Sequence, residues 1–120
     1  MKYEGNIFTE GESMEWEEVA PGMKRKIVGY DDNIMMVHVH FEKGGIGVQH
    51  AHHHSQTSFV VSGKFEVTID GESKILKAND AFYPPPHVMH GAVCLEEGVL
   101  IDVFSPVRED FLAGDSGYTK

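Results

Sequence analysis

Cysteine and long apolar segments are the first things this sequence lacks. Cys94 is the single cysteine among 120 residues, so no disulfide can form within the chain and a reducing compartment is expected. No run of about 18 apolar residues occurs, which argues against a membrane span. Residues 1–6 also lack the apolar centre of a signal peptide. We therefore expect a cytoplasmic protein without a membrane partner.

Basic residues are also scarce. Lys and Arg number 10 against 19 Asp and Glu, which gives a formal net charge of -9. Because phosphate binding depends on Lys and Arg, this balance argues against a nucleic-acid partner. Hydrophobic residues make up 41% and charged residues 24% of the chain, a globular rather than a disordered composition. A chain of this length forms about one domain around one core.

Helical spacing is weak and occurs only in residues 108–112, whereas short alternating segments separated by turns dominate the chain. The clearest is 34–41, in which every second residue from Met35 to Phe41 is apolar. The predicted strands are 24–30, 34–41, 57–61, 64–69, 74–76, 81–83, 91–95 and 99–104, with turns at Ser62-Gly63, Asp70-Gly71 and Asn79-Asp80. Many short strands at this spacing predict an all-β sandwich or barrel.

The composition changes near residue 22, and we divide the chain there. Residues 1–22 are predicted to form an acidic N-terminal arm or edge strand, with Met14 and Trp16 as its apolar anchors. The barrel is expected over residues 23–112, and residues 113–120 form a C-terminal tail.

A histidine cluster is the main functional signal. Two residues at i and i+2 on a strand point the same way, so His50 and His52 could bind one metal ion. The spacing from Gly44 through His50, His52 and Gln56 to Gly63 resembles the first cupin motif, with glutamine where glutamate is usual. The second motif is matched more loosely: Pro85 and His90 fit, whereas Asn79, His87 and Cys94 replace its glycines and asparagine.

The cupin resemblance implies a single-domain double-stranded β-helix, or jelly-roll barrel, with a metal bound by His50, His52, Gln56 and His90. Three imidazoles and an amide oxygen suit a divalent transition metal such as Ni, Zn, Fe, Mn or Co. All four ligands are neutral, which favours Lewis-acid chemistry. The alternative is a histidine cluster on a solvated loop that merely scavenges metal.

The remaining histidines are assigned less specific roles. His53 and His54 flank the ligand positions and are expected not to bind the metal, and at least one should point away from it. His87 is expected to shape its loop. His38 and His40 either line the pocket or face solvent.

Asp102 is the one carboxylate in a strongly apolar strand, where it shares a face with Leu100 and Phe104. A buried charge is costly unless it is paired, so Asp102 is either satisfied structurally or kept for chemistry. An exposed acid on an edge strand is the alternative. Arg108 could pair with Asp102, bind a substrate carboxylate in a bidentate fork, or lie on the surface.

A wider resemblance covers the chain from about Trp16 to Leu112. Residues 24–26, 30–33, 60–65, 90–95 and 100–112 are similar to the KdgF family of pectin-degradation cupins. The resemblance includes Gln56 at the fourth ligand position. It implies a metal-dependent enzyme that converts 4,5-unsaturated monouronates, released from pectin or alginate, to linear 5-keto-4-deoxyuronate. Asp102, Phe104 and Arg108 would be its active-site residues.

Two other functions remain open at this point. One is a cupin dioxygenase, which would need reducible iron and open coordination positions. The other is a non-catalytic module that binds a sugar or a metal, because fold alone does not dictate function. The family resemblance also implies a homodimer, and Trp16 is the residue of the arm that could anchor the interface.

Overall fold

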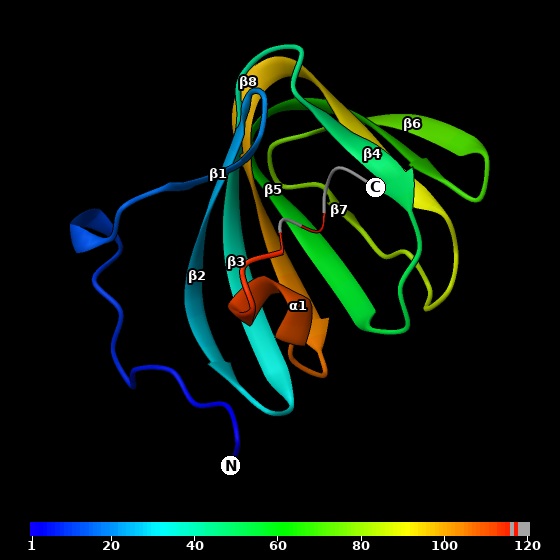
Figure 1. The fold of residues 1–120 in the computed structure, drawn as a ribbon. Helices are drawn as coiled ribbons and strands as arrows, with labels where there is room; N and C mark the ends of the chain where they lie inside the picture. Colours follow the sequence, from blue (N-terminus) through cyan, green and yellow to red (C-terminus); the bar gives the residue numbers. More distant parts are fainter. Residues whose placement is uncertain (116, 118–120) are drawn as a thin grey trace.

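Strands form most of the chain in the computed structural model, which describes residues 1–115 and 117 (Figure 1). A 3-10 turn, η1 (Gly11–Ser13), precedes them and a short helix, α1 (Glu109–Leu112), follows them. The strands are β1 (Glu17–Ala20), β2 (Met23–Asp31), β3 (Ile34–Phe41), β4 (Ile46–His50), β5 (Ser55–Ile69), β6 (Glu72–Lys77), β7 (Ala81–Phe82) and β8 (His90–Ser105). The all-β prediction is confirmed, and no helix among the described residues is long and apolar enough to cross a membrane.

Two long antiparallel strands, β5 and β8, run through both halves of the barrel (Figure 1). The C-terminal half of β8, from Gly98 on, lies between β3 and the N-terminal half of β5. The N-terminal half of β8 pairs with β4 on one side and with the C-terminal half of β5 on the other. Strands β2 and β1 extend the first half, and β6 extends the second. This is the jelly-roll arrangement that the cupin spacing predicts.

The predicted breaks within these long strands are wrong. Ser62-Gly63 is not a turn but a bend inside β5, and β8 continues without interruption from His90 to Ser105. The β5–β8 register shifts between Val60 and Phe65, as it does at β-bulges. Gly63 has a φ of +85°, and a Cβ on it would lie 2.6 Å from the carbonyl oxygens of Glu96 and Glu97. A glycine therefore marks a bulge here rather than a chain reversal.

Two local predictions are confirmed. Strand β3 covers residues 34–41, and its side chains Met35, Val37, Val39 and Phe41 are buried in the core. The Asp70-Gly71 turn joins β5 to β6, and both residues have positive φ, as a type I′ hairpin turn requires. His38 and His40 lie on the opposite face of β3, and His40 pairs with Glu97 at 2.9 Å.

The N-terminal residues lie along β2. Glu4 bridges to Asp31, and the backbone N–H of Tyr3 donates to the Asp32 carboxylate at 2.6 Å. Strand β1 lies within the proposed arm 1–22 and pairs with β2, so the arm contributes a strand to the sheet. Within the proposed tail, residues 116 and 118–120 lie outside the described part of the chain.

We expect Gly63→Ala to destabilise the protein more than Gly71→Ala. Both glycines have positive φ, which costs an alanine about 1 kcal/mol, but Gly71 faces open space whereas Gly63 packs against Glu96 and Glu97. The free energy of unfolding, measured in urea, should fall by about 1 kcal/mol for Gly71→Ala and by at least about 2 kcal/mol for Gly63→Ala. Equal losses would contradict the close packing at the bulge.

Candidate functional site

Three histidines converge at one end of the barrel. His50 ends β4, His52 lies in the loop that follows, and His90 begins β8. The β4–β8 pairing places His50 directly opposite His90. One ring nitrogen of each of the three lies within 4.8 Å of those of the other two. The structure thus brings together the three predicted histidines, although His52 sits beyond the strand rather than on it.

The hydrogen bonds of these rings select their tautomers. A backbone carbonyl can only accept, so an Nδ1 that faces one carries the proton and leaves the Nε2 lone pair free. All three rings have such a bond, to a carbonyl two residues away: His50 to Val48 at 2.8 Å, His52 to His54 at 3.2 Å and His90 to Val88 at 2.9 Å. This is the usual preparation of metal-binding histidines. The buried Nε2 of His90 has no hydrogen-bond partner among the described residues.

Burial also keeps the three rings neutral. Desolvation is the largest cause that lowers the pKa of His50, His52 and His90, and the charge of Arg108 lowers them further. For His52 the pKa falls to about 4. The imidazoles are therefore available as ligands at neutral pH, and the donor set fits a divalent transition metal. A cluster on a solvated loop, the alternative considered from the sequence, does not describe this site.

Gln56 on β5 reaches the same cluster. Its Oε1 lies 2.9 Å from Nε2 of His52. Adjacent ligands at about 2.1 Å from one ion lie about 3 Å apart, so this spacing fits two donors to a shared metal. The amide of Gln56 is buried, and its Nε2 donates to Oγ of Ser58 at 3.0 Å.

Asp102 lies on the inner face of β8, where it is 4% exposed. Strand β8 is central at this point because Asp102 pairs with Val37 of β3 and with Ser58 of β5. The interpretation as an exposed acid on an edge strand is therefore wrong. The Ser58 hydroxyl donates to Oδ1 of Asp102 at 2.6 Å. Ser58 was not predicted as a site residue, and its only signal in the sequence is its place two residues after Gln56 on the same face of a strand.

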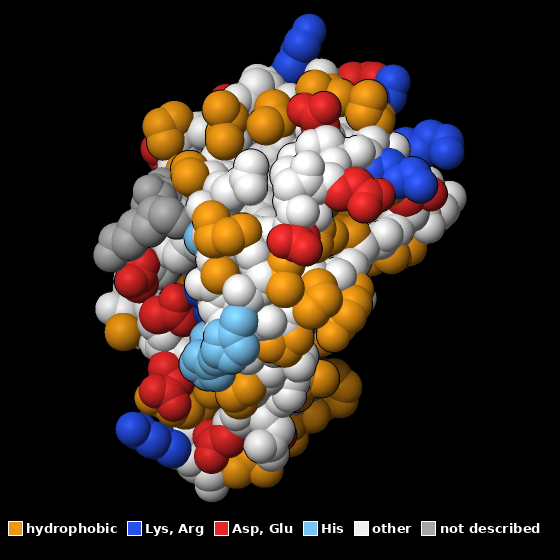
Figure 2. All heavy atoms as spheres, turned by 90° about the vertical axis from the view of Figure 1, so that its right-hand side faces the viewer, with side chains coloured by type: hydrophobic (Ala, Val, Ile, Leu, Met, Phe, Trp, Pro, Cys, Tyr) orange, Lys and Arg blue, Asp and Glu red, His pale blue; other side chains and the backbone are white. Residues whose placement is uncertain are grey.

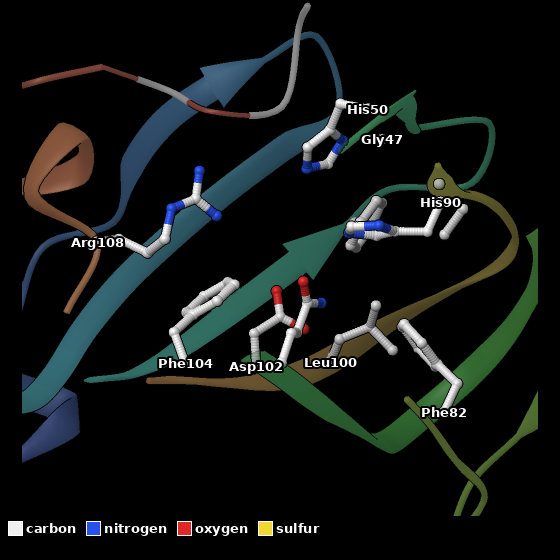
Figure 3. A pocket seen from close by; sticks show the side chains of 12 residues that line it. Gly47, His50, Phe82, His90, Leu100, Asp102, Phe104 and Arg108 are labelled. Carbon is white, nitrogen blue, oxygen red and sulfur yellow. The ribbon is translucent and has the colours of Figure 1, made fainter. Parts of the chain in front are cut away.

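A pocket with about 420 Å³ of empty volume, including space open to solvent, is lined by His50, Gln56, His90, Asp102 and Arg108. Figure 3 shows the side chains of His50, His90, Asp102 and Arg108 turned toward this common space, with Phe104 between the acid and the guanidinium. Its lining combines polar groups with an apolar wall of Phe41, Phe82, Ala92, Leu100 and Phe104.

Arg108 lies just before α1 and is only 4% exposed, so it is not a surface arginine. Its partner is Asp110 rather than Asp102: Nε and Nη2 donate to the two carboxylate oxygens at 3.0 and 2.8 Å. Burial acts to raise the pKa of Asp110, but the hydrogen bonds and charge of Arg108 outweigh it and hold that pKa below its usual value. The guanidinium also stacks on Phe104 at 4.9 Å and on Phe111 at 4.1 Å.

The other histidines lie around the cluster rather than in it. His54 is buried, and its ring centroid lies 3.9 Å from that of exposed His53, 5.3 Å from that of His52 and 6.5 Å from that of Phe104. His87 has a φ of +69°, and its N–H donates to the carbonyl of His52 at 2.8 Å, so it helps to shape the ligand loop. Figure 2 shows exposed histidine side chains gathered on one face, with Asp and Glu beside them.

Comparison with known proteins gives consistent results at the levels of sequence and structure. Residues 37–104 match the Cupin domain family. The chain is 56% identical over 99 residues to the pectin degradation protein KdgF of Dickeya dadantii, covering 81% of this chain and 90% of that protein.

Two solved structures resemble the fold closely. An RmlC-like cupin from Shewanella frigidimarina matches with a TM-score of 0.88 and 50% identity, over 90% of this chain and 97% of that one. The KdgF structure from a Halomonas species matches with a TM-score of 0.86 and 43% identity, over 89% and 99% of the two chains. The chain therefore belongs to the cupin family and, within it, to the KdgF group of pectin-degradation proteins.

Proposed function

We propose that this protein opens the ring of 4,5-unsaturated monouronates from pectin or alginate breakdown and forms linear 5-keto-4-deoxyuronate. The observation that carries the proposal is a pocket lined by His50 and His90 of the three-histidine cluster, a buried acid and a buried arginine in a KdgF-like chain. An anionic sugar needs a cation for its carboxylate, and ring opening needs a group that moves a proton.

His50, His52, His90 and Gln56 are the proposed ligands of a divalent transition metal. Nε2 of each imidazole and Oε1 of the amide are the donor atoms, as the tautomers and the 2.9 Å contact between His52 and Gln56 indicate. When bound, the ion supplies Lewis acidity to the oxygen atoms of the substrate. Ni, Zn, Fe, Mn and Co all accept such ligands, so the donor set alone does not select one.

Asp102 is the proposed acid and base. It takes the proton of the anomeric hydroxyl, the bond from C1 to the ring oxygen breaks, and C1 becomes an aldehyde. The electron pair left on the ring oxygen forms an enolate with C5 and C4. Asp102 then returns the proton to C4, which leaves a ketone at C5, so the reaction is an isomerisation with no other reactant. The Asp102 carboxylate is buried and lines the pocket, so little water can exchange with the proton that it carries from the anomeric hydroxyl to C4.

Arg108 is the proposed carboxylate-binding residue. A guanidinium has five N–H donors, and among the described residues Asp110 accepts two of them, which leaves three for a ligand. Phe104 stacks against the guanidinium and lines the pocket, so it orients Arg108 and also forms an apolar wall beside the sugar.

A homodimer and a cytoplasmic location are also part of the proposal. Trp16 packs against Lys26 and His40 of its own chain, whereas Ile7 and Phe8 are 94% and 87% exposed and could contact a partner. Further large apolar side chains are exposed elsewhere on the surface (Figure 2). Sedimentation at micromolar concentration tests the dimer, and a monomer there would refute it. Cys94 is buried and free, as a reducing compartment allows.

Incubation of the metal-loaded protein with an unsaturated monouronate tests the function. We expect the ultraviolet absorbance of the conjugated double bond to decay faster than without enzyme. NMR of the product should show a linear ketone. Oxygen consumption with iron-loaded protein would instead indicate a dioxygenase, and tight uronate binding without turnover would indicate a binding module.

We expect Asp102→Asn to lower kcat by about 100-fold or more, because the amide cannot take up the proton. The change preserves shape and an oxygen that can accept from Ser58, so the fold should persist. Glu96→Gln is the matched control, since Glu96 is an exposed acid on the same strand that pairs with Lys64. The same absorbance assay measures both variants. A kcat for Asp102→Asn equal to that of the control would remove Asp102 as acid and base.

The affinity for Zn²⁺ should persist to unusually low pH. An ordinary histidine takes up a proton near pH 6.5 and then competes with metal, but the ligands here have lowered pKa values, about 4 for His52. Competition with a coloured chelator should show affinity retained at pH 6 and lost as pH falls toward 4. His53→Gln, at an exposed neighbouring residue, should follow the same curve. Loss of affinity centred near pH 6.5 would indicate exposed ligands.

A further inference from the structure

A line of buried hydrogen bonds connects the candidate metal ligand Gln56 to the candidate acid Asp102, and Ser58 is its middle member. We propose that Ser58 is a positioning residue that fixes the orientation of the Gln56 amide and of the Asp102 carboxylate together. The inference rests on the proposed function for its catalytic consequence. The hydrogen bonds themselves involve only the side chains of Gln56, Ser58 and Asp102.

The direction of each hydrogen bond follows from which groups can donate. A carboxylate only accepts, so the short 2.6 Å contact to Asp102 uses the single proton of the Ser58 hydroxyl. The Ser58 oxygen can then only accept from Gln56, and the group that faces it at 3.0 Å must be the amide NH₂. The amide oxygen is thereby turned toward His52, where the contact is 2.9 Å. The Ser58 hydroxyl thus turns Oε1 of Gln56, the proposed metal-coordinating atom, toward the three histidines.

The same constraint favours an amide over a carboxylate at residue 56. A glutamate there would present an oxygen to Ser58, whose one proton is already committed to Asp102. Two acceptors would then face a single hydrogen, which a buried site tolerates poorly. The glutamine that distinguishes this chain from the general cupin motif is therefore the residue that Ser58 can satisfy.

The position of Ser58 supports a specific role. It is 2% exposed and lies on the inner face of β5 with Gln56 and Val60, all three buried. Antiparallel pairing sets it directly opposite Asp102. A hydroxyl in such a place is costly unless it is hydrogen-bonded, and here it has a partner on each side.

The test compares Ser58→Ala, Ser58→Thr and the control Ser55→Ala, which removes an exposed hydroxyl from the same strand. NMR of the Zn²⁺-loaded, nitrogen-15-labelled proteins follows the side-chain amide of Gln56, assigned by its loss in Gln56→Glu. In Ser58→Ala we expect this signal to shift and its hydrogens to exchange about 10-fold faster, with neither change in the control. In the activity assay kcat should fall about 10- to 100-fold with a smaller change in KM, and Ser58→Thr should restore most of it.

Two results would overturn the proposal: a Gln56 amide signal in Ser58→Ala identical to that of the unmodified protein, or an unchanged kcat. If Ser58→Ala does not fold, the unmodified protein still decides, because the Gln56 amide hydrogens must show a nuclear Overhauser contact to the Ser58 methylene. Its absence would refute the placement. If the unmodified protein does not act on unsaturated uronates, the proposed function fails, whereas the amide signals still decide the role of Ser58.

Discussion

Antiparallel pairing between β5 and β8 holds the two halves of the barrel together and decides which site residues are neighbours. In this register Gln56 lies opposite Phe104 and Ser58 opposite Asp102. Because side chains alternate across a strand, a slip of β5 by one residue would turn both Gln56 and Ser58 away from the face that carries Asp102. The hydrogen bonds from Gln56 through Ser58 to Asp102 exist only in the observed register.

Strand β8 also brings together site residues that are far apart in the sequence. Strand β8 carries His90 at its start and Asp102 near its end, and Arg108 lies three residues beyond that end. A flat strand of this length would spread these groups along one edge. The bend where Gly63 packs against the segment from Glu96 to Gly98 divides the strand between the two halves of the barrel, and His90 and Asp102 line one pocket. Backbone packing far from the chemistry therefore shapes the site.

Sequence reasoning worked where a side-chain pattern carried the signal. Alternation over residues 34–41 predicted β3, and histidine spacing predicted the cluster. It failed where a residue type has two uses: glycine suggested a turn at Ser62-Gly63, and the bulge there depends on the partner strand. Ser58 and Asp110 were missed because a lone serine or acid acquires meaning only through the neighbour that folding supplies.

The bidentate ion pair between Arg108 and Asp110 has a consequence for turnover. In the proposed reaction the substrate carboxylate is untouched by ring opening, so the product would carry the same anion into the same contact with Arg108. An arginine that bound this anion as strongly as possible would hold both equally, and such uniform binding does not raise kcat. Asp110 already neutralises part of the guanidinium charge. Under the proposed role of Arg108, this ion pair would leave enough attraction to orient the sugar acid while weakening the hold on the linear product, which favours release.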